Sequence, residues 1–168
     1  TMVNDVSGFQ MDQRMVDVIS SSRVRYVLTH IQGVPRDMQK HPTYDDVVDE
    51  VYRFFKVQVS WALSKGVAFE QFILDPGIGF GKTVTHNLEL LRSLDSFLDL
   101  EIPLLIGLSR KSFIGKIQND GGPHERLSGS LAAAVFAYLQ GVTLFRVHDV
   151  SETKKALKIA SAIQWGHE

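Results

Sequence analysis

The sequence predicts an α/β fold with parallel strands, and three observations support this. Short apolar runs recur along the chain and are too short and too continuous for helices, which is typical of buried strands. Longer stretches between them repeat apolar residues at three- and four-residue spacing, as amphipathic helices do. Polar residues follow every predicted strand. Because neighbouring parallel strands need long crossovers, the alternation favours a parallel sheet with helices outside it.

Five strands and five helices are predicted. The strands cover residues 2–3, 26–28, 72–74, 104–106 and 144–145. The helices cover about 11–21, 44–64, 87–99, 127–140 and a stretch after Ser151. The helix over 44–64 is the clearest, with Thr43 as its N-cap, Asp46 three residues on and Gly66 beyond its end. Residues 118–123 are predicted to form a mobile surface loop. No linker or internal repeat divides 1–168.

The composition excludes several classes of protein. Hydrophobic residues make up 44% and charged residues 22%, which is ordinary for a globular domain and argues against disorder or a fibrous repeat. The net charge of −1 gives no long-range reason to expect nucleic acid or an acidic membrane as a partner. With no cysteine, disulfides, zinc thiolate sites and cysteine nucleophiles are excluded. No apolar run approaches the ~20 residues of a membrane span, and no signal peptide is visible. We therefore expect a cytoplasmic protein.

The polar residues at the strand ends indicate which α/β architecture is present. They are Asn4-Asp5, Thr29-His30, Asp75, Ser109-Arg110-Lys111 and Arg146-Val147-His148-Asp149. A doubly wound sheet concentrates its site at one switch point, whereas a closed barrel brings all strand ends to one mouth. Polar residues at all five ends favour a (β/α)8 barrel. Such a barrel usually needs ~250 residues, so we expect about three N-terminal βα units to be absent from this chain.

Cationic residues cluster after the last two strands. They are Arg110, Lys111, Arg146 and His148. Barrels commonly bind phosphate after their final strands. Arginine offers a planar fork and lysine a point charge for phosphate oxygens. An anionic ligand is predicted, with a solvated basic face as the alternative.

The glycine-rich segment 75–83 matches no nucleotide-binding motif. Its first required P-loop glycine falls on Pro76, and the third glycine of the dinucleotide pattern falls on Lys82. What remains is an Asp at a strand end, followed by a loop whose glycines let backbone approach a ligand. Phe80 in this loop either covers a ligand or packs within the loop.

Three side chains at strand ends have alternative roles. Asn4 and Asp75 could accept N–H groups from a guanidine-like edge of a ligand, or could cap the turns that follow them. His30 could line the mouth or be structural. The histidines show no metal-ligand spacing, so no metal-binding residues are predicted.

Five segments resemble dihydropteroate synthase in order and spacing. They are Asn4-Asp5-Val6-Ser7-Gly8, 29–35 with Met38-Gln39, 75–82, 109–115 and 146–150. The Asp-Pro-Gly-x-Gly-Phe-Gly-Lys and Ser-Arg-Lys segments are the most specific. The resemblance spans the chain and implies about strands 4–8 of a (β/α)8 TIM barrel. Residues 1–168 would then be an N-terminally incomplete pterin-binding domain.

The resemblance implies an enzyme of folate biosynthesis. Members of this family join 4-aminobenzoate to 6-hydroxymethyl-7,8-dihydropterin diphosphate, which yields 7,8-dihydropteroate and diphosphate. Mg2+ assists, the enzymes are usually homodimers, and sulfonamides compete with 4-aminobenzoate. No nucleic acid or membrane partner is implied.

The resemblance also implies roles for individual residues. Asn4 and Asp75 would bind the amino-pyrimidine edge of the pterin, with Gly79, Phe80, Gly107 and Lys111 also contacting the pterin. Ser109, at the start of its helix, and Phe80 would meet 4-aminobenzoate, which Lys111 would face. Arg146 and His148 would hold the diphosphate. Lys111, Arg146 and His148 would be the catalytic residues.

Two departures from the family pattern and two alternatives remain. Thr29 and Ile31 stand where the family often has Met, so a hydroxyl replaces an apolar wall. The family's first-strand loops and third-strand Asp have no counterpart, so we expect these 168 residues alone not to turn over substrate; measurable dihydropteroate formation would contradict this.

A methyl-transferring pterin barrel would keep Asn4 and Asp75 but does not need Arg146 or His148. A catalytically incompetent pterin-binding or dimerisation module is the other alternative.

Overall fold

The computed structural model describes residues 1–119 and 122–166, and its strands follow one another in chain order. The strands are β1 Met2–Asp5, β2 Arg25–Thr29, β3 Phe72–Asp75, β4 Leu105–Ile106 and β5 Leu144–Phe145. β1, β2 and β3 form a parallel sheet in that order, and β4 pairs with β5 in parallel. A parallel bridge between Leu74 and Leu104 joins the two sheets, and the Leu74 N–H donates to the Pro103 carbonyl at 2.9 Å.

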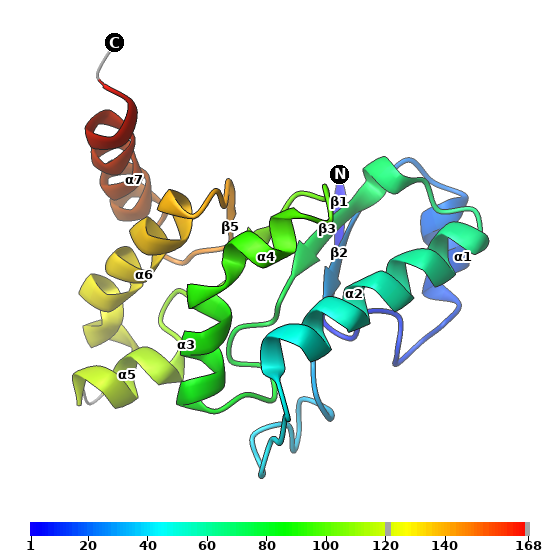
Figure 1. Ribbon diagram of the computed structural model, residues 1–168, viewed down its shortest axis with the longest axis horizontal. Coiled ribbons are helices and arrows are strands. Elements are labelled where there is room, and N and C mark those ends of the chain that lie inside the picture. The colour runs from blue at the N-terminus through cyan, green and yellow to red at the C-terminus, as the bar shows by residue number, and fades with distance from the viewer. Residues whose placement is uncertain (120–121, 167–168) are drawn as a thin grey trace.

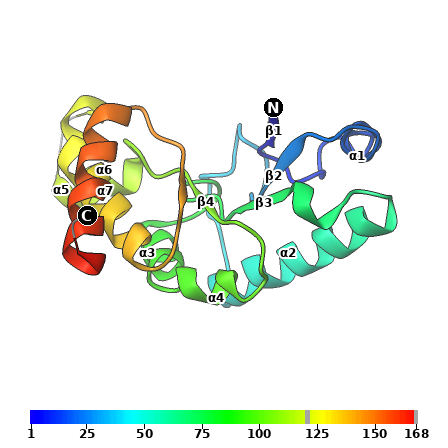
Figure 2. The ribbon, with the colours of Figure 1, turned by 90° about the horizontal axis from the view of Figure 1, so that it is seen from above.

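This strand order is that of a barrel wall. Crossovers between parallel strands are almost always right-handed, so adding each strand on the same side places every helix on one face. Figure 2 shows α1, α2, α4, α3 and α6 following one another around the outside of the strands. A doubly wound sheet would reverse direction and carry helices on both faces. Among the described residues β1 pairs only with β2, and β5 only with β4, so the strands form an open arc.

Seven helices lie in the described part of the chain (Figure 1). They are α1 Met15–Ser20, α2 Val47–Ser64, α3 Val84–Arg92, α4 Leu94–Leu98, α5 Ser112–Gln118, α6 Leu127–Leu139 and α7 Val150–Trp165, with 3-10 turns at Phe69–Gln71 and Pro123–Arg126. None of these described helices is long and apolar enough to cross a bilayer.

The strands separate two apolar clusters. Side chains alternate along a strand, so Phe72 and Leu74 pack outward against the helices while Ile73 faces inward. Ile73 forms a small inner cluster with Val27 and Leu105, against which Leu144 is partly buried. The residue two places beyond each of these faces inward as well. The alternation therefore places the polar strand ends directly above this small inner cluster, which we call the apolar plug.

Several predicted helix starts differ from the structure, and the helix predicted over about 11–21 begins only at Met15. α2 begins at Val47 because the Asp46 carboxylate accepts the N–H groups of Val48 and Asp49 and so caps the helix. Thr43 instead pairs its backbone N–H and carbonyl with the Gln32 side chain. The last helix begins at Val150 rather than after Ser151.

The predicted helix over 87–99 is two helices. α3 begins at Val84 because Thr83 forms a reciprocal capping box with His86, and the helical geometry breaks at Ser93. The short helix α5 has no counterpart among the five predicted helices. Of the predicted loop 118–123, Gln118 ends α5 and Pro123 opens a 3-10 turn, while residues 120–121 lie outside the described part.

Candidate functional site

A polar pocket lies where the carboxyl ends of the strands meet. Its volume is about 260 Å³, and its wall comes from β1, the loop after β3, and the ends of β4 and β5. The lining residues are Asn4, Val6, Phe80, Gly107, Ser109, Lys111, Arg146, Val147 and His148. Seven of the nine side chains or backbones that the sequence assigns to a site therefore share one hollow. The other two, Asp75 and Gly79, adjoin it through Arg146 and Lys111.

A guanidinium group connects three strand ends at the base of this pocket. Arg146 Nη2 donates to Asp75 Oδ2 at 2.8 Å, and Arg146 Nη1 donates to Asn4 Oδ1 at 2.7 Å. The other oxygen of the fully buried Asp75 carboxylate accepts the Gly77 N–H at 2.9 Å. A Cβ at Gly107 would lie 2.5 Å from Arg146 Nη2, so this glycine makes room for the guanidinium. The base of the pocket is therefore built to hold a flat group that carries two N–H donors.

Lys111 and Phe80 form one side of the pocket. The Lys111 ammonium lies 4.2 Å from the centroid of the Phe80 ring, within cation–π range. Burial lowers the pKa of Lys111, Asp75 raises it, and the positive Arg146 lowers it further. Burial also makes the remaining positive charge interact strongly with any anion that enters, because little water screens it.

Ser109 and His148 form the rim near the end of β5. The Ser109 hydroxyl lies 3.1 Å from His148 Nδ1 and accepts the His148 backbone N–H at 3.3 Å. These contacts fix the imidazole ring beside Arg146. Ser109 does not lie at the start of its helix as predicted, because α5 begins at Ser112 with Lys111 as its N-cap.

The glycine loop after β3 is held from three directions. The Gly79 N–H donates to Asn87 Oδ1 at 2.7 Å, and the Gly79 carbonyl accepts Gln39 Nε2 at 2.5 Å. The Tyr44 hydroxyl donates to the Gly81 carbonyl at 2.9 Å. The loop that presents Phe80 is therefore positioned before any ligand arrives.

Sequence reasoning assigned no role to the buried Lys82, which it noted only as a failed motif position and as the last residue of the Asp-Pro-Gly-x-Gly-Phe-Gly-Lys segment. Its ammonium lies 2.9 Å from His30 Nδ1 and donates to the Phe80 carbonyl at 3.0 Å. Burial lowers the pKa of Lys82 to about 7, Asp75 opposes this, and Lys111 adds to it. Burial, with the nearby Lys82 charge, also lowers the pKa of His30. His30 is buried, its ring packs edge-on against Phe54, and it is not among the residues that line the pocket, so its position fits the structural alternative. The signal available in the sequence was a lysine directly after a glycine-rich loop.

Thr29 is the second residue whose surroundings the sequence could not show. It pairs with Asp75 across β2 and β3 and is fully buried. Its hydroxyl oxygen has no hydrogen-bond partner among the residues that the structure describes. An unsatisfied buried hydroxyl costs about 1–3 kcal/mol of folding free energy, so other contacts of the folded chain offset this cost at Thr29.

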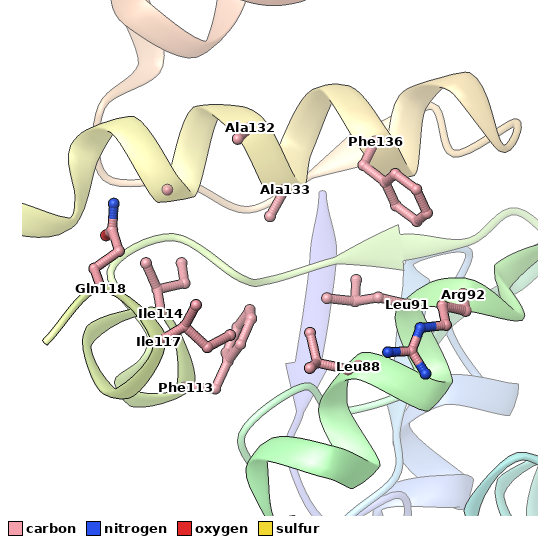
Figure 3. Close-up of a pocket in the computed structure, with 11 residues that line it drawn as sticks. Leu88, Leu91, Arg92, Phe113, Ile114, Ile117, Gln118, Ala132, Ala133 and Phe136 are labelled. Atoms are coloured by element: carbon pink, nitrogen blue, oxygen red, sulfur yellow. The ribbon is translucent and has the colours of Figure 1, made fainter.

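A second, apolar pocket lies on the outer helices. Figure 3 shows Phe113, Ile114 and Ile117 of α5 facing Leu88 of α3 and Phe136 of α6. Its volume is about 380 Å³, and it contains none of the residues assigned to the site. It lacks convergent polar groups, so the pocket at the strand ends is the candidate active site.

The described residues do not supply a metal-binding cluster. In residues 1–119 and 122–166, no three His, Cys, Asp or Glu side chains come together as ligands for an ion. Mg2+ commonly binds through one or two carboxylates together with substrate phosphates and water. The described residues alone therefore do not fit a resident metal site.

A singly wound β/α wall whose strand ends share one pocket defines part of a ligand-binding β/α barrel. Residues 1–148 match the family described as pterin binding enzyme, and the chain belongs to this family.

Its relatives are dihydropteroate synthases. The Escherichia coli (strain K12) enzyme is 44% identical over 161 residues, which are 96% of this chain and 56% of that protein. The Yersinia pestis enzyme, solved with a sulfonamide drug, superposes with a TM-score of 0.94 at 38% identity over 99% of this chain and 60% of that one. The Thermus thermophilus enzyme, solved with 6HMPPP, gives 0.90 at 44% identity over 96% and 64%. The predicted barrel class is confirmed, and the chain spans less than two thirds of each relative.

Proposed function

We propose that this chain supplies the pterin- and diphosphate-binding strands of a dihydropteroate synthase. The reaction joins 6-hydroxymethyl-7,8-dihydropterin diphosphate to 4-aminobenzoate and releases diphosphate. One observation carries the proposal: Asn4, Lys111 and Arg146, which come from three strand ends, line a single pocket, and Asp75 of a fourth strand end adjoins it through Arg146. The dihydropteroate synthase relatives support it.

The pterin would bind at the base of the pocket. Its amino-pyrimidine edge presents two N–H donors, which the Asp75 carboxylate and the Asn4 amide oxygen would accept. Asp75 is fully buried and already accepts a backbone N–H, so its position is fixed before the pterin binds. Gly79, Gly107, Phe80 and Lys111 would enclose the ring.

The diphosphate would bind at the rim. Breaking the C–O bond at the pterin methylene places negative charge on the leaving diphosphate and positive charge on the pterin. Arg146 and His148 would stabilise the first, as oxyanion sites do. The Asp75 carboxylate, at the pterin edge, would favour the second. We propose a dissociative displacement; a kinetic isotope effect at the methylene that showed tight associative attack would contradict it.

4-Aminobenzoate would attack from the side of Ser109 and Phe80. Its neutral arylamine nitrogen is nucleophilic, so no strong base is needed. The nitrogen forms the new bond to the methylene, the C–O bond breaks, and the arylammonium proton passes to solvent. Lys111 faces this side of the pocket above Phe80.

Mg2+ belongs to the proposal as an ion that arrives with the diphosphate. The described residues lack a three-ligand set, so no step is assigned to the metal. Sulfonamide competition and a cytoplasmic location stay predictions.

A homodimer is also proposed. The outer face around α5, α6 and α7 exposes Ile117, Phe136, Leu139, Ile163 and Trp165, and a second copy would cover it. Phe136→Glu should halve the mass of the native protein in sedimentation equilibrium, whereas Val57→Glu, at an exposed apolar residue of α2, should not. An unchanged mass would contradict this face as the interface.

Calorimetry with the pterin diphosphate tests the main proposal. We expect Mg2+-linked binding that Arg146→Ala weakens, because the diphosphate loses a bidentate cation. Arg53→Ala is the matched control, since Arg53 is exposed on α2 and pairs with Asp49. A non-catalytic module predicts no such dependence, and no binding at all would refute the proposal.

A further inference from the structure

Arg146 occupies the place that the pterin edge is proposed to take. Its two terminal nitrogens donate to Asn4 Oδ1 and Asp75 Oδ2, which are the two acceptors assigned to the pterin. A guanidinium presents two N–H groups on nitrogens that flank one carbon. The amino-pyrimidine edge of a pterin presents the same fork, from its exocyclic amine and its ring N–H. The two groups therefore compete for the same pair of acceptors.

The space that the Arg146 guanidinium occupies fits this side chain but does not enclose it. Gly107 leaves the room in which the guanidinium lies, since a Cβ there would contact Arg146 Nη2 and Cζ. The Arg146 side chain is 39% exposed, whereas that of Asp75 is 1% exposed. The Arg146 side chain can therefore move out toward the rim, whereas the Asp75 carboxylate stays where it is and needs another N–H donor.

We propose that Arg146 is an internal stand-in for the pterin edge: in the empty site its guanidinium occupies the position of that edge. The incoming pterin would displace the guanidinium toward the diphosphate site. This inference rests on the proposed function and adds a step to it. In the empty site Arg146 satisfies the buried Asp75 charge, which would be costly to leave alone. When the pterin arrives, its two N–H groups replace those of the guanidinium. The freed guanidinium then lies beside His148, where a diphosphate would meet it.

The exchange makes the two halves of the substrate cooperative. A pterin without a diphosphate must displace a charge-assisted pair and offers Arg146 no new anion. A diphosphate gives Arg146 a partner at the rim and so empties the base for the pterin. By linkage, each ligand should raise the affinity for the other by the same factor.

Removing the guanidinium should therefore have opposite effects on two ligands. We expect Arg146→Ala to bind 6-hydroxymethylpterin about tenfold more tightly than the wild type does, because no charge-assisted pair has to be broken. The same variant should bind the pterin diphosphate more weakly. In the wild type, inorganic diphosphate should tighten binding of 6-hydroxymethylpterin, and Arg146→Ala should lose this coupling. Calorimetry at one fixed pH measures all of these, with Arg53→Ala as the control.

Two further measurements separate the possible failures. Arg146→Lys keeps a positive charge but cannot donate to both acceptors as a fork, so its affinity for 6-hydroxymethylpterin should lie between those of the wild type and Arg146→Ala. It also replaces Arg146→Ala in this test if that variant does not fold. Methylguanidinium at low millimolar concentration should raise the Tm of Arg146→Ala and not that of the wild type. If Arg146→Ala binds 6-hydroxymethylpterin no more tightly than the wild type, or ignores methylguanidinium, the stand-in is refuted while the proposed function stands. If the wild type binds no pterin in any form, both are refuted.

Discussion

The Lys82 ammonium lies 2.9 Å from His30 Nδ1, so a buried amine–imidazole contact joins the end of β2 to the glycine loop after β3. Both groups are almost fully buried, and neither touches the pocket at the strand ends. The contact fixes the loop that carries Phe80, and it makes the stability of the fold depend on pH.

The first prediction concerns that pH dependence. Burial lowers the pKa of Lys82 to about 7, whereas the unfolded chain has the ordinary value of 10.5. Between these values the unfolded state binds more protons, so stability rises with pH from about 7 to about 10.5, by up to ~1.4 kcal/mol per pH unit. Lys82→Met should flatten this rise in urea unfolding at pH 7, 8 and 9. An equal slope in both proteins would show that Lys82 is not the titrating group.

The second prediction concerns the carboxylate at the end of β1. Burial raises the pKa of Asp5, but hydrogen bonds from Ser7, Phe9 and Tyr26 outweigh this and lower it overall. This stabilisation is present above the unfolded pKa of 3.8 and is lost as pH falls through the folded pKa.

Asp5→Asn should therefore cost about 1–3 kcal/mol at pH 7 and progressively less below pH 4. Urea unfolding at both pH values measures the difference. Asp12→Asn is the control, because the Asp12 carboxylate is exposed and, among the described residues, accepts hydrogen bonds only from Arg14, two residues on. A loss that stayed constant down to low pH would exclude an ionic origin.

The third prediction concerns the backbone of the glycine loop. Gly77 has φ +68°, and a Cβ there would overlap the backbone carbonyl of His30. Gly77→Ala should destabilise the protein by at least about 2 kcal/mol, because it combines backbone strain with a clash against rigid backbone. Gly122→Ala, with open space around its Cβ, should be nearly neutral. Thermal unfolding compares the two, and equal Tm values would contradict the geometry.

The fourth prediction concerns the rim. Ser109→Ala removes the hydroxyl that accepts from His148 and faces its Nδ1. We expect binding of the pterin diphosphate to weaken about fivefold, since a neutral hydrogen bond contributes about 1 kcal/mol. Ser112→Ala, an exposed position of α5, should leave affinity unchanged in the same calorimetry. Equal affinities for both variants would show that the Ser109 contact does not position the imidazole.

Local signals were enough to predict the strands and the barrel class. All five apolar runs match strands to within two residues, because buried parallel strands are apolar on both faces. Helix starts were less accurate where capping decided them: Asp46 and Thr83 each fix a boundary through the contacts of a single capping side chain. Such a contact depends on one rotamer and leaves little trace in periodicity.

The site was predictable as a set of residues but not as a network. Strand-end polarity and the resemblance place Asn4, Asp75 and Arg146 at one mouth. Nothing in the sequence shows that Arg146 turns down onto Asp75, which lies 71 positions earlier in the chain. The burial of Lys82 and Thr29 is equally invisible, because it results from neighbours contributed by other strands.

The inner face of the arc also requires an even spacing between the residues of a strand that face inward. In β3 the plug residue Ile73 and the inward-facing Asp75 are two places apart, and Leu144 of β5 and Arg146, which directly follows β5, repeat that spacing. Inserting one residue between the members of either pair would turn the functional group toward the helices, whereas inserting two would keep it facing inward. Length changes should therefore accumulate in the loops beyond the strand tips, and within the strands only even steps are compatible with both the packing and the chemistry.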